Sequence, residues 1–346
     1  MLVYWILFLL PAVGVAFPLR LPRRQALVMF LLVAAVIAAF MGLRDQVGGD
    51  WFNYLPTFDY ISTLDFAGAL SFGDPAYSLL NWIAARLGGD IYAVNLVCAA
   101  IMMIGIGRFC RSLPNPWLAL LVAVPYTLIV VGMGYTRQSV ALGLVMLGLV
   151  ALGQRRTRAF VIWVALAALF HRTAVLLIPI AAIVTTRRRV WTAFWVGVAF
   201  ATVYVLLLQP DTDTLWANYV QAQMQSHGGL IRVLMNALPA ALLLLFRKRL
   251  VEDPQSRRLW SLFAGLALAC VPLVFMASTA VDRMALYLIP LQLFVFSQLY
   301  LLARTTNTRT LIVVGVGVYY AAVQFVWLNY AVDAPYWVPY HFMPWS

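Results

Sequence analysis

The residues from 43 to 60, LRDQVGGDWFNYLPTFDY, carry three aspartates, one arginine and five aromatic rings between two apolar runs. Asp50 follows two glycines, which allow another backbone or a ligand to approach closely. A carboxylate beside a hydroxyl can act as a general base, and the rings of Trp51 and Tyr54 can lie against sugar faces. Two structural explanations compete, because Asp50 can also cap the helix through Tyr54 or pair with Arg44.

His171 is the second candidate for proton transfer, because histidine side chains titrate near neutral pH. It lies in the apolar stretch 159–184, 13 residues after Arg158. At ~1.5 Å per residue this places it about 20 Å from that end, or about two-thirds of the way across ~30 Å of hydrocarbon. His171 is then at the floor of an outward cavity. The alternative is a structural histidine that hydrogen-bonds a carbonyl where the stretch breaks.

Three arginines, Arg137, Arg232 and Arg283, stand at the starts of apolar helices that run inward from the outer side. A cation at a helix N-terminus opposes the helix dipole, so local helix stability does not explain it. Guanidinium groups and free backbone N–H groups at one depth favour phosphate, and a pyrophosphate on a lipid carrier is the ligand expected there. The alternatives are contacts with lipid headgroups and ion pairs with outer acids such as Asp282.

The composition indicates the class of protein. Of 346 residues, 64% are hydrophobic and 10% are charged, and the mean hydropathy is +0.89. A soluble core cannot bury so much apolar surface, whereas a bilayer can, so we predict an all-α polytopic membrane protein with a single transmembrane domain, 1–346. The net charge of +12 reflects membrane orientation and not binding to nucleic acid. The three cysteines show no metal or disulfide spacing, and no cofactor and no metal site are expected.

Ten apolar runs reach the roughly 17 to 25 residues that a membrane-spanning helix needs. Two further segments differ from these. Residues 75–87 are short and amphipathic, which favours a re-entrant or interfacial helix. Residues 159–184 are interrupted by His171-Arg172 and Pro179, which favours a hairpin of two half-spanning pieces. The ten runs are 1–19, 25–43, 90–109, 116–133, 137–153, 190–209, 230–246, 259–277, 284–303 and 310–328.

The distribution of basic residues indicates the orientation, because cytoplasmic loops carry an excess of arginine and lysine. With the N-terminus outside and 159–184 as a hairpin, 18 of the 24 basic residues fall on the cytoplasmic side. The predicted outer segments are 44–89, 210–229 and 329–346. The six basic residues left outside are Arg44, Arg86, Arg137, Arg172, Arg232 and Arg283.

Four blocks of sequence together resemble the EpsG family of Wzy-like exopolysaccharide polymerases. They are LRDQVGGDWFNY, GYTRQSVALGL, ALAALFHRTAVLLIP and DRMALYLIP, and their order and spacing match over roughly residues 40–290. The segment GDPAYSLLNW also resembles the family's acidic-Pro-aromatic segment, with Asp74 where glutamate is more usual.

The resemblance implies a glycosyltransferase of the bacterial inner (cytoplasmic) membrane that elongates polysaccharide on undecaprenyl pyrophosphate at the periplasmic face. Its partners are then the undecaprenyl-pyrophosphate-linked oligosaccharide, membrane lipids, and flippase, chain-length regulator and export proteins. Because pyrophosphate is a good leaving group, guanidinium groups can replace a metal, and a single base implies inversion at the anomeric carbon. Arg172 and Arg232 are added from the charge distribution alone. The residues that match the family's blocks are Arg44, Asp50, Tyr54, Arg137, Gln138, His171 and Arg283.

Two other functions use similar residues. A lipid-linked oligosaccharide flippase or other transporter binds the same pyrophosphate but needs gates on both faces, and the polar residues here cluster on one side. Another periplasmic transferase, such as an O-antigen ligase or an acyltransferase, needs a longer outer loop or a more prominent His/Asp set. A GT-C-like arrangement of helices is expected by analogy alone.

Overall fold

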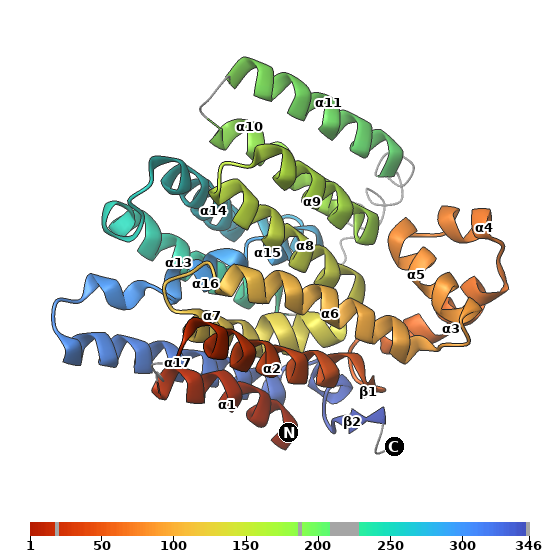
Figure 1. The fold of residues 1–346 in the computed structure, drawn as a ribbon, viewed down its shortest axis with the longest axis horizontal. Helices are drawn as coiled ribbons and strands as arrows, with labels where there is room; N and C mark the ends of the chain where they lie inside the picture. The colour runs from red at the N-terminus through yellow and green to blue at the C-terminus, as the bar shows by residue number, and fades with distance from the viewer. Residues whose placement is uncertain (18–20, 186–188, 208–227, 344–346) are drawn as a thin grey trace.

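The computed structural model is almost entirely helical, with many helices side by side (Figure 1). It describes residues 1–17, 21–185, 189–207 and 228–343. Within these ranges the strands are β1 (Arg44–Asp45) and β2 (His341–Phe342), which pair antiparallel. The predicted all-α polytopic membrane fold is therefore confirmed.

The count of ten spans is not confirmed. In the described part of the chain, six helices are long and apolar enough to cross a bilayer, and a seventh span results if one bent helix pair is counted as one. The six are α2 (Arg23–Gly42), α6 (Ile91–Cys110), α8 (Thr136–Gly153), α11 (Arg189–Leu207), α13 (Gly229–Leu250) and α17 (Thr306–Tyr330).

Helix breaks explain most of the difference between the predicted and the observed number of spans. A run of residues can stay apolar even where the helix within it ends. Proline lacks a backbone N–H and interrupts helical hydrogen bonding. A π-helix containing Pro125 follows α7, and the chain bends by 52° before Pro290 between α15 and α16. The shorter or interrupted elements are α1 (Leu2–Ala16), α7 (Pro116–Ala123), η1 (Val124–Gly132), α15 (Ser278–Leu286), α16 (Pro290–Phe296) and η5 (Leu299–Leu302). Helix α14 (Pro254–Leu273) is continuous and 20 residues long, but it is not among the six.

Helices α6 and α8 lie at the centre and run in the same direction. Near their starts, the Thr136 hydroxyl lies 3.4 Å from Asn95 Oδ1. Further along, a Cβ on Gly105 would lie 2.0 Å from the carbonyl oxygen of Gly143, so only glycine permits this close packing. The starts of both helices therefore share one end of the bundle, and their last turns share the other.

The stretch 159–184 forms the predicted hairpin. Helix α9 (Thr157–Phe170) ends at His171, whose backbone is extended, and η2 (Arg172–Leu177) and α10 (Ile180–Val184) follow. The hydroxyl oxygens of Thr157 and Thr185 lie 3.2 Å apart, so the two ends of the hairpin meet. His171, at its tip, reaches the start of α8, where it contacts Gln138.

The predicted outer segment 44–89 forms, after β1, three short helices, α3 (Trp51–Thr63), α4 (Phe66–Ser71) and α5 (Pro75–Arg86). They stand together at the right-hand end of the bundle in Figure 1. The predicted amphipathic segment 75–87 corresponds to α5, which begins with Pro75 as its first residue, a favoured position for proline. Of the predicted outer segment 210–229, residues 210–227 lie outside the described residues.

The chain after α17 returns to the loops that precede α3 and α8. Trp337, just after η6 (Ala334–Tyr336), is completely buried, and its indole N–H donates to the carbonyl oxygen of Ile129 at 3.0 Å. Its ring lies so close to Gly134 that a Cβ there would be 2.5 Å away. The neighbouring Tyr336 carbonyl accepts from Gly48 N at 2.8 Å. This tail therefore fixes the two loops that lead to Asp50 and Arg137.

Replacing Trp337 by alanine should destabilise the protein by about 3–5 kcal/mol, the usual cost of emptying a large aromatic site. The matched control is Tyr336→Ala, because the neighbouring Tyr336 side chain is 49% exposed. Thermal unfolding in detergent compares the two variants. Equal melting temperatures for both would contradict a bracing role for Trp337.

Candidate functional site

A cavity of about 400 Å³ opens between helices α3 and α5 and the starts of the central helices. Six of the residues selected from the sequence line it: Asp50, Tyr54, Arg137, Gln138, His171 and Arg283. They come from α3 and the turn before it, the first turn of α8, the tip of the 159–184 hairpin, and α15. The structure thus brings together side chains that are up to 233 residues apart in the chain, from Asp50 to Arg283.

Backbone geometry places Asp50 at the cavity. Gly48 has φ of +111°, and a Cβ there would lie 2.2 Å from the carbonyl oxygen of Met133, so a larger residue is excluded. The Asp50 N–H donates to the carbonyl of Gly134 at 3.3 Å. Although Asp50 immediately precedes α3, its side chain makes no capping hydrogen bond. Instead, its carboxylate accepts from the Tyr54 hydroxyl at 3.4 Å.

Arg137 is held by a carboxylate that the sequence analysis did not select. Its Nη1 lies 3.0 Å from Oδ2 of Asp74, and the Asp74 side chain is only 6% exposed. The Arg137 guanidinium also lies over the ring of Tyr54, 6.0 Å from its centroid. Asp74 precedes Pro75 at the start of α5, and this acidic-Pro pair was the available signal.

Arg172 contacts the same carboxylate from the tip of the hairpin. Its Nε lies 3.6 Å from Asp74 Oδ1, and its Nη2 donates to the carbonyl of Gly73. One buried carboxylate therefore joins α5 to α8 and to η2. Including Arg172, the described residues place three guanidinium groups and two carboxylates, those of Asp50 and Asp74, around the cavity, a formal excess of one positive charge among them.

His171 and Gln138 form a pair in the cavity wall. Gln138 Nε2 lies 3.0 Å from His171 Nε2. When the Gln138 amide N–H donates, His171 Nε2 is the acceptor and the ring proton is on Nδ1. When the amide is turned so that its oxygen faces the ring, His171 Nε2 carries the proton and donates it. Nδ1 is buried and has no hydrogen-bond partner among the described residues.

Arg232 does not line this cavity, contrary to the expectation of three convergent arginines. Its Nε donates to Asp282 Oδ1 at 2.6 Å, and both side chains are nearly buried. The ion pair considered as the alternative is thus the observed arrangement. Successive residues of a helix point about 100° apart, so Asp282 holds Arg232 while its neighbour Arg283 reaches the cavity.

Arg44 and Trp51 also lie outside the cavity lining. Arg44 is 1% exposed and donates to the carbonyls of Met41 and Val47 and, at 2.8 Å, to the hydroxyl of Thr136. A guanidinium at the C-terminal carbonyls of α2 is electrostatically favourable. Trp51 is likewise buried, with its ring 5.6 Å from the Arg44 guanidinium. Both residues support the loop before Asp50.

Replacing Arg44 by glutamine should lower the free energy of unfolding by about 2–4 kcal/mol, because buried acceptors lose a charged donor. A direct role in ligand binding would instead leave thermal stability unchanged and weaken substrate binding. Arg86→Gln is the control, since Arg86 is an exposed arginine that does not line the cavity. Thermal unfolding in detergent measures both variants.

Burial sets the electrostatics of the two carboxylates. It raises the pKa of Asp50, and the nearby Arg137 and Arg283 partly oppose this. It also raises the pKa of Asp74, opposed by Arg137 and Arg172. An aspartate with a raised pKa is a stronger base when ionised, which suits proton abstraction.

Hydroxyl, amide and aromatic side chains complete the lining. The Tyr54 and Tyr77 rings lie 5.6 Å apart. Aromatic faces with polar groups at their edges suit sugar rings, which have apolar faces and hydroxyl rims. The lining residues that sequence reasoning did not select are Asn53, Thr57, Phe72, Gly73, Asp74, Tyr77, Ser78 and Tyr135.

Comparison with known proteins gives one match. Residues 27–342 match the model of the EpsG family. Neither a curated protein nor a solved structure matches the chain. Because the match covers nearly the whole chain, this multi-pass membrane protein belongs to the EpsG family, a family of Wzy-like polymerases.

Proposed function

We propose that this protein joins undecaprenyl-pyrophosphate-linked oligosaccharide units into exopolysaccharide at the periplasmic face of the bacterial inner membrane. The supporting observation is the cavity itself, which combines the Asp50 carboxylate with the guanidinium groups of Arg137 and Arg283. It opens beside the outer segment, at the end of the bundle that the charge distribution assigns to the outside.

In the proposed reaction, the growing chain is the donor and its pyrophosphate lies against Arg137 and Arg283. A hydroxyl oxygen of the new repeat unit attacks the anomeric carbon, while the bond from that carbon to the pyrophosphate oxygen breaks. The electron pair leaves with the pyrophosphate, whose developing charge the guanidinium groups stabilise. The hydroxyl proton passes to Asp50 or His171.

Direct displacement with one base inverts the anomeric configuration. NMR analysis of polymer made from a donor of known configuration tests this step. A linkage opposite to that of the donor is expected. A linkage that keeps the donor's configuration would require a different mechanism at the same site.

Asp74 positions the anion-binding groups in this proposal. It holds Arg137 at 3.0 Å and Arg172 at 3.6 Å, so both guanidinium groups are oriented before any ligand arrives. Orientation in advance reduces the reorganisation that transition-state stabilisation would otherwise require. Each guanidinium has five N–H donors, so an incoming phosphate can share these groups with Asp74.

The activity is tested in a strain that lacks the gene, complemented with the wild-type sequence. We expect the deletion to remove polymer and to leave single lipid-linked repeat units on the periplasmic leaflet. Units trapped on the cytoplasmic leaflet would identify a flippase instead. Polymer of normal length that stays on its carrier would identify a ligase.

A further inference from the structure

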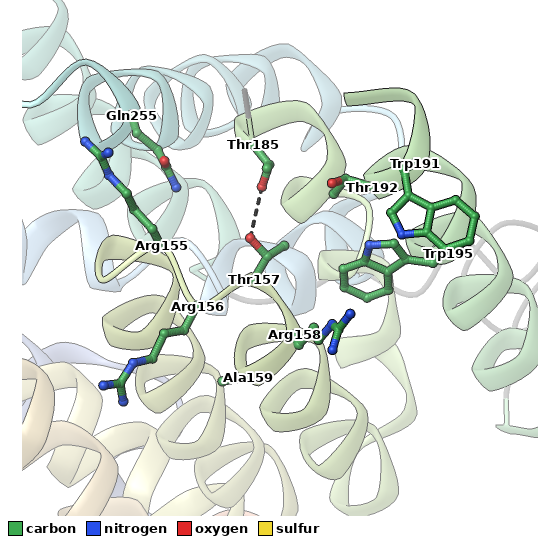
Figure 2. Close-up of a pocket in the computed structure, with 10 residues that line it drawn as sticks. All are labelled: Arg155, Arg156, Thr157, Arg158, Ala159, Thr185, Trp191, Thr192, Trp195 and Gln255. Carbon is green, nitrogen blue, oxygen red and sulfur yellow. Dashed lines mark hydrogen bonds between the residues drawn. The ribbon is translucent and has the colours of Figure 1, made fainter. Parts of the chain in front are cut away.

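A second cavity, of about 1050 Å³, lies at the opposite end of α8 and α9 from the candidate site. Helix α9 separates the two, because its first residue, Thr157, lines this cavity and His171, just after its last, lines the other. Its 14 residues span about 21 Å at ~1.5 Å each. The turn from α8 to α9, the end of α10, the first turns of α11 and the start of α14 form its walls (Figure 2).

The wall of this second cavity is cationic. Arg155, Arg156 and Arg158 line it, and none of the described residues that line it carries a carboxylate. Figure 2 shows Arg155 extending toward Gln255 and Arg158 lying on the side of Trp195. Arg155 pairs at 3.1 Å with the exposed carboxylate of Asp253. In the described part of the chain, no ion pair involves Arg156 or Arg158. Such a lining favours an anionic ligand.

Apolar side chains lead away from this cationic wall along two helices. On α9, Arg158 is followed at four-residue steps by Ile162 and Leu166, which lie on the same helix face and are 60% and 40% exposed. On α11, Trp191 lines the cavity at 59% exposure, and the exposed Phe194 stacks on it at 5.8 Å. Tryptophan is typical of the membrane–water interface. The combination fits a ligand with an anionic head and apolar chains.

We propose that this second cavity binds the phosphate headgroup of an anionic phospholipid in the leaflet opposite the candidate site. The phosphate lies in the cavity that Arg155 and Arg158 line, and the acyl chains follow Ile162 and Leu166. Membrane orientation explains why arginines occur in this turn. Membrane orientation does not explain why these arginines line a cavity together with tryptophans, or why exposed apolar side chains follow along α9 and α11.

The test uses the full-length protein in uncharged detergent and counts bound lipids by native mass spectrometry. Phosphatidylglycerol should remain bound and phosphatidylcholine should not. Replacing Arg155 and Arg158 together by glutamine should weaken phosphatidylglycerol binding roughly 25-fold, since each arginine near an anionic lipid contributes about 5-fold. Arg108→Gln with Arg111→Gln is the matched control, because both arginines are exposed at the same end of the bundle.

Three outcomes would overturn the proposal. Equal weakening in both double variants would mean diffuse attraction to a basic surface. Equal retention of both lipids would mean that charge is not recognised. Displacement of phosphatidylglycerol by inorganic phosphate alone at similar concentration would mean a site for a soluble anion.

If the variants fail to fold, a photoreactive phosphatidylglycerol on the unmodified protein tests the proposal. Crosslinks in 155–166 and 191–198 support the site, and crosslinks elsewhere contradict it.

Discussion

Replacing Arg137 by glutamine should reduce polymer synthesis about 10²–10³-fold while leaving the protein folded. The reason is that its guanidinium is placed at the cavity by the buried Asp74 and by Tyr54, and removing one donor that stabilises a developing oxyanion typically costs this much. Arg137→Lys should recover only part of the rate, because an ammonium group cannot form the two parallel hydrogen bonds of a guanidinium. The measurement is the rate of polymer formation from lipid-linked units by reconstituted protein.

The control for Arg137 is Arg86→Gln. Arg86 is also among the arginines predicted to lie outside, but it stacks on Trp82 and does not line the cavity. Thermal unfolding must accompany the rates, because Arg137→Gln also removes one partner of Asp74, which retains Arg172. Full activity in a folded Arg137→Gln variant would remove the central element of the proposed mechanism.

Replacing Asp50 by asparagine should lower the rate about 10²–10⁴-fold, the usual contribution of a positioned general base. The substitution keeps the size of the side chain, and the wild-type carboxylate makes no capping bond, so little loss of stability is expected. Asp45→Asn is the matched control, because Asp45 accepts from Tyr92 and lies outside the cavity lining.

The pH dependence of the rate separates Asp50 from His171. Burial raises the pKa of Asp50 above its ordinary value, and only the ionised carboxylate can accept a proton. Wild-type activity should therefore fall as the pH drops through that raised pKa, and this acidic decline should vanish from the residual activity of Asp50→Asn. A decline that persists in Asp50→Asn but disappears in His171→Gln would assign the base to His171.

The sequence by itself was sufficient for the class of fold and for much of the site. The composition predicts a helical bundle in a membrane, because only a bilayer can cover so much apolar surface. The break at His171 was visible because a polar pair and a proline interrupt the apolar run, and those features act locally. The structure brings Asp50, Tyr54 and Arg137 into one cavity. In the sequence, Asp50 stood out as a carboxylate after two glycines and Arg137 as an arginine at a helix start.

Tertiary structure determined which charges meet. Asp74 binds Arg137 across 63 residues, and no local pattern encodes that distance. The sequence predicts Arg232 and Arg283 alike at helix starts, but Arg283 lies in the last turn of α15. Arg232 pairs with Asp282, and of these two arginines Arg283 is the one that reaches the cavity. The choice depends on how α13 and α15 are rotated against each other, which packing sets and hydropathy does not report.

The number of spans and the bracing by Trp337 were likewise beyond the sequence. Apolar runs conceal helix breaks, because the bilayer requires low polarity whether the backbone is straight, bent or π-helical. Trp337 donates to Ile129 across 208 residues, and an aromatic tail that ends a membrane chain is equally typical of an interfacial belt. The composition was enough to predict that this protein lies in a lipid bilayer. Only long-range packing determined which polar groups line its cavity.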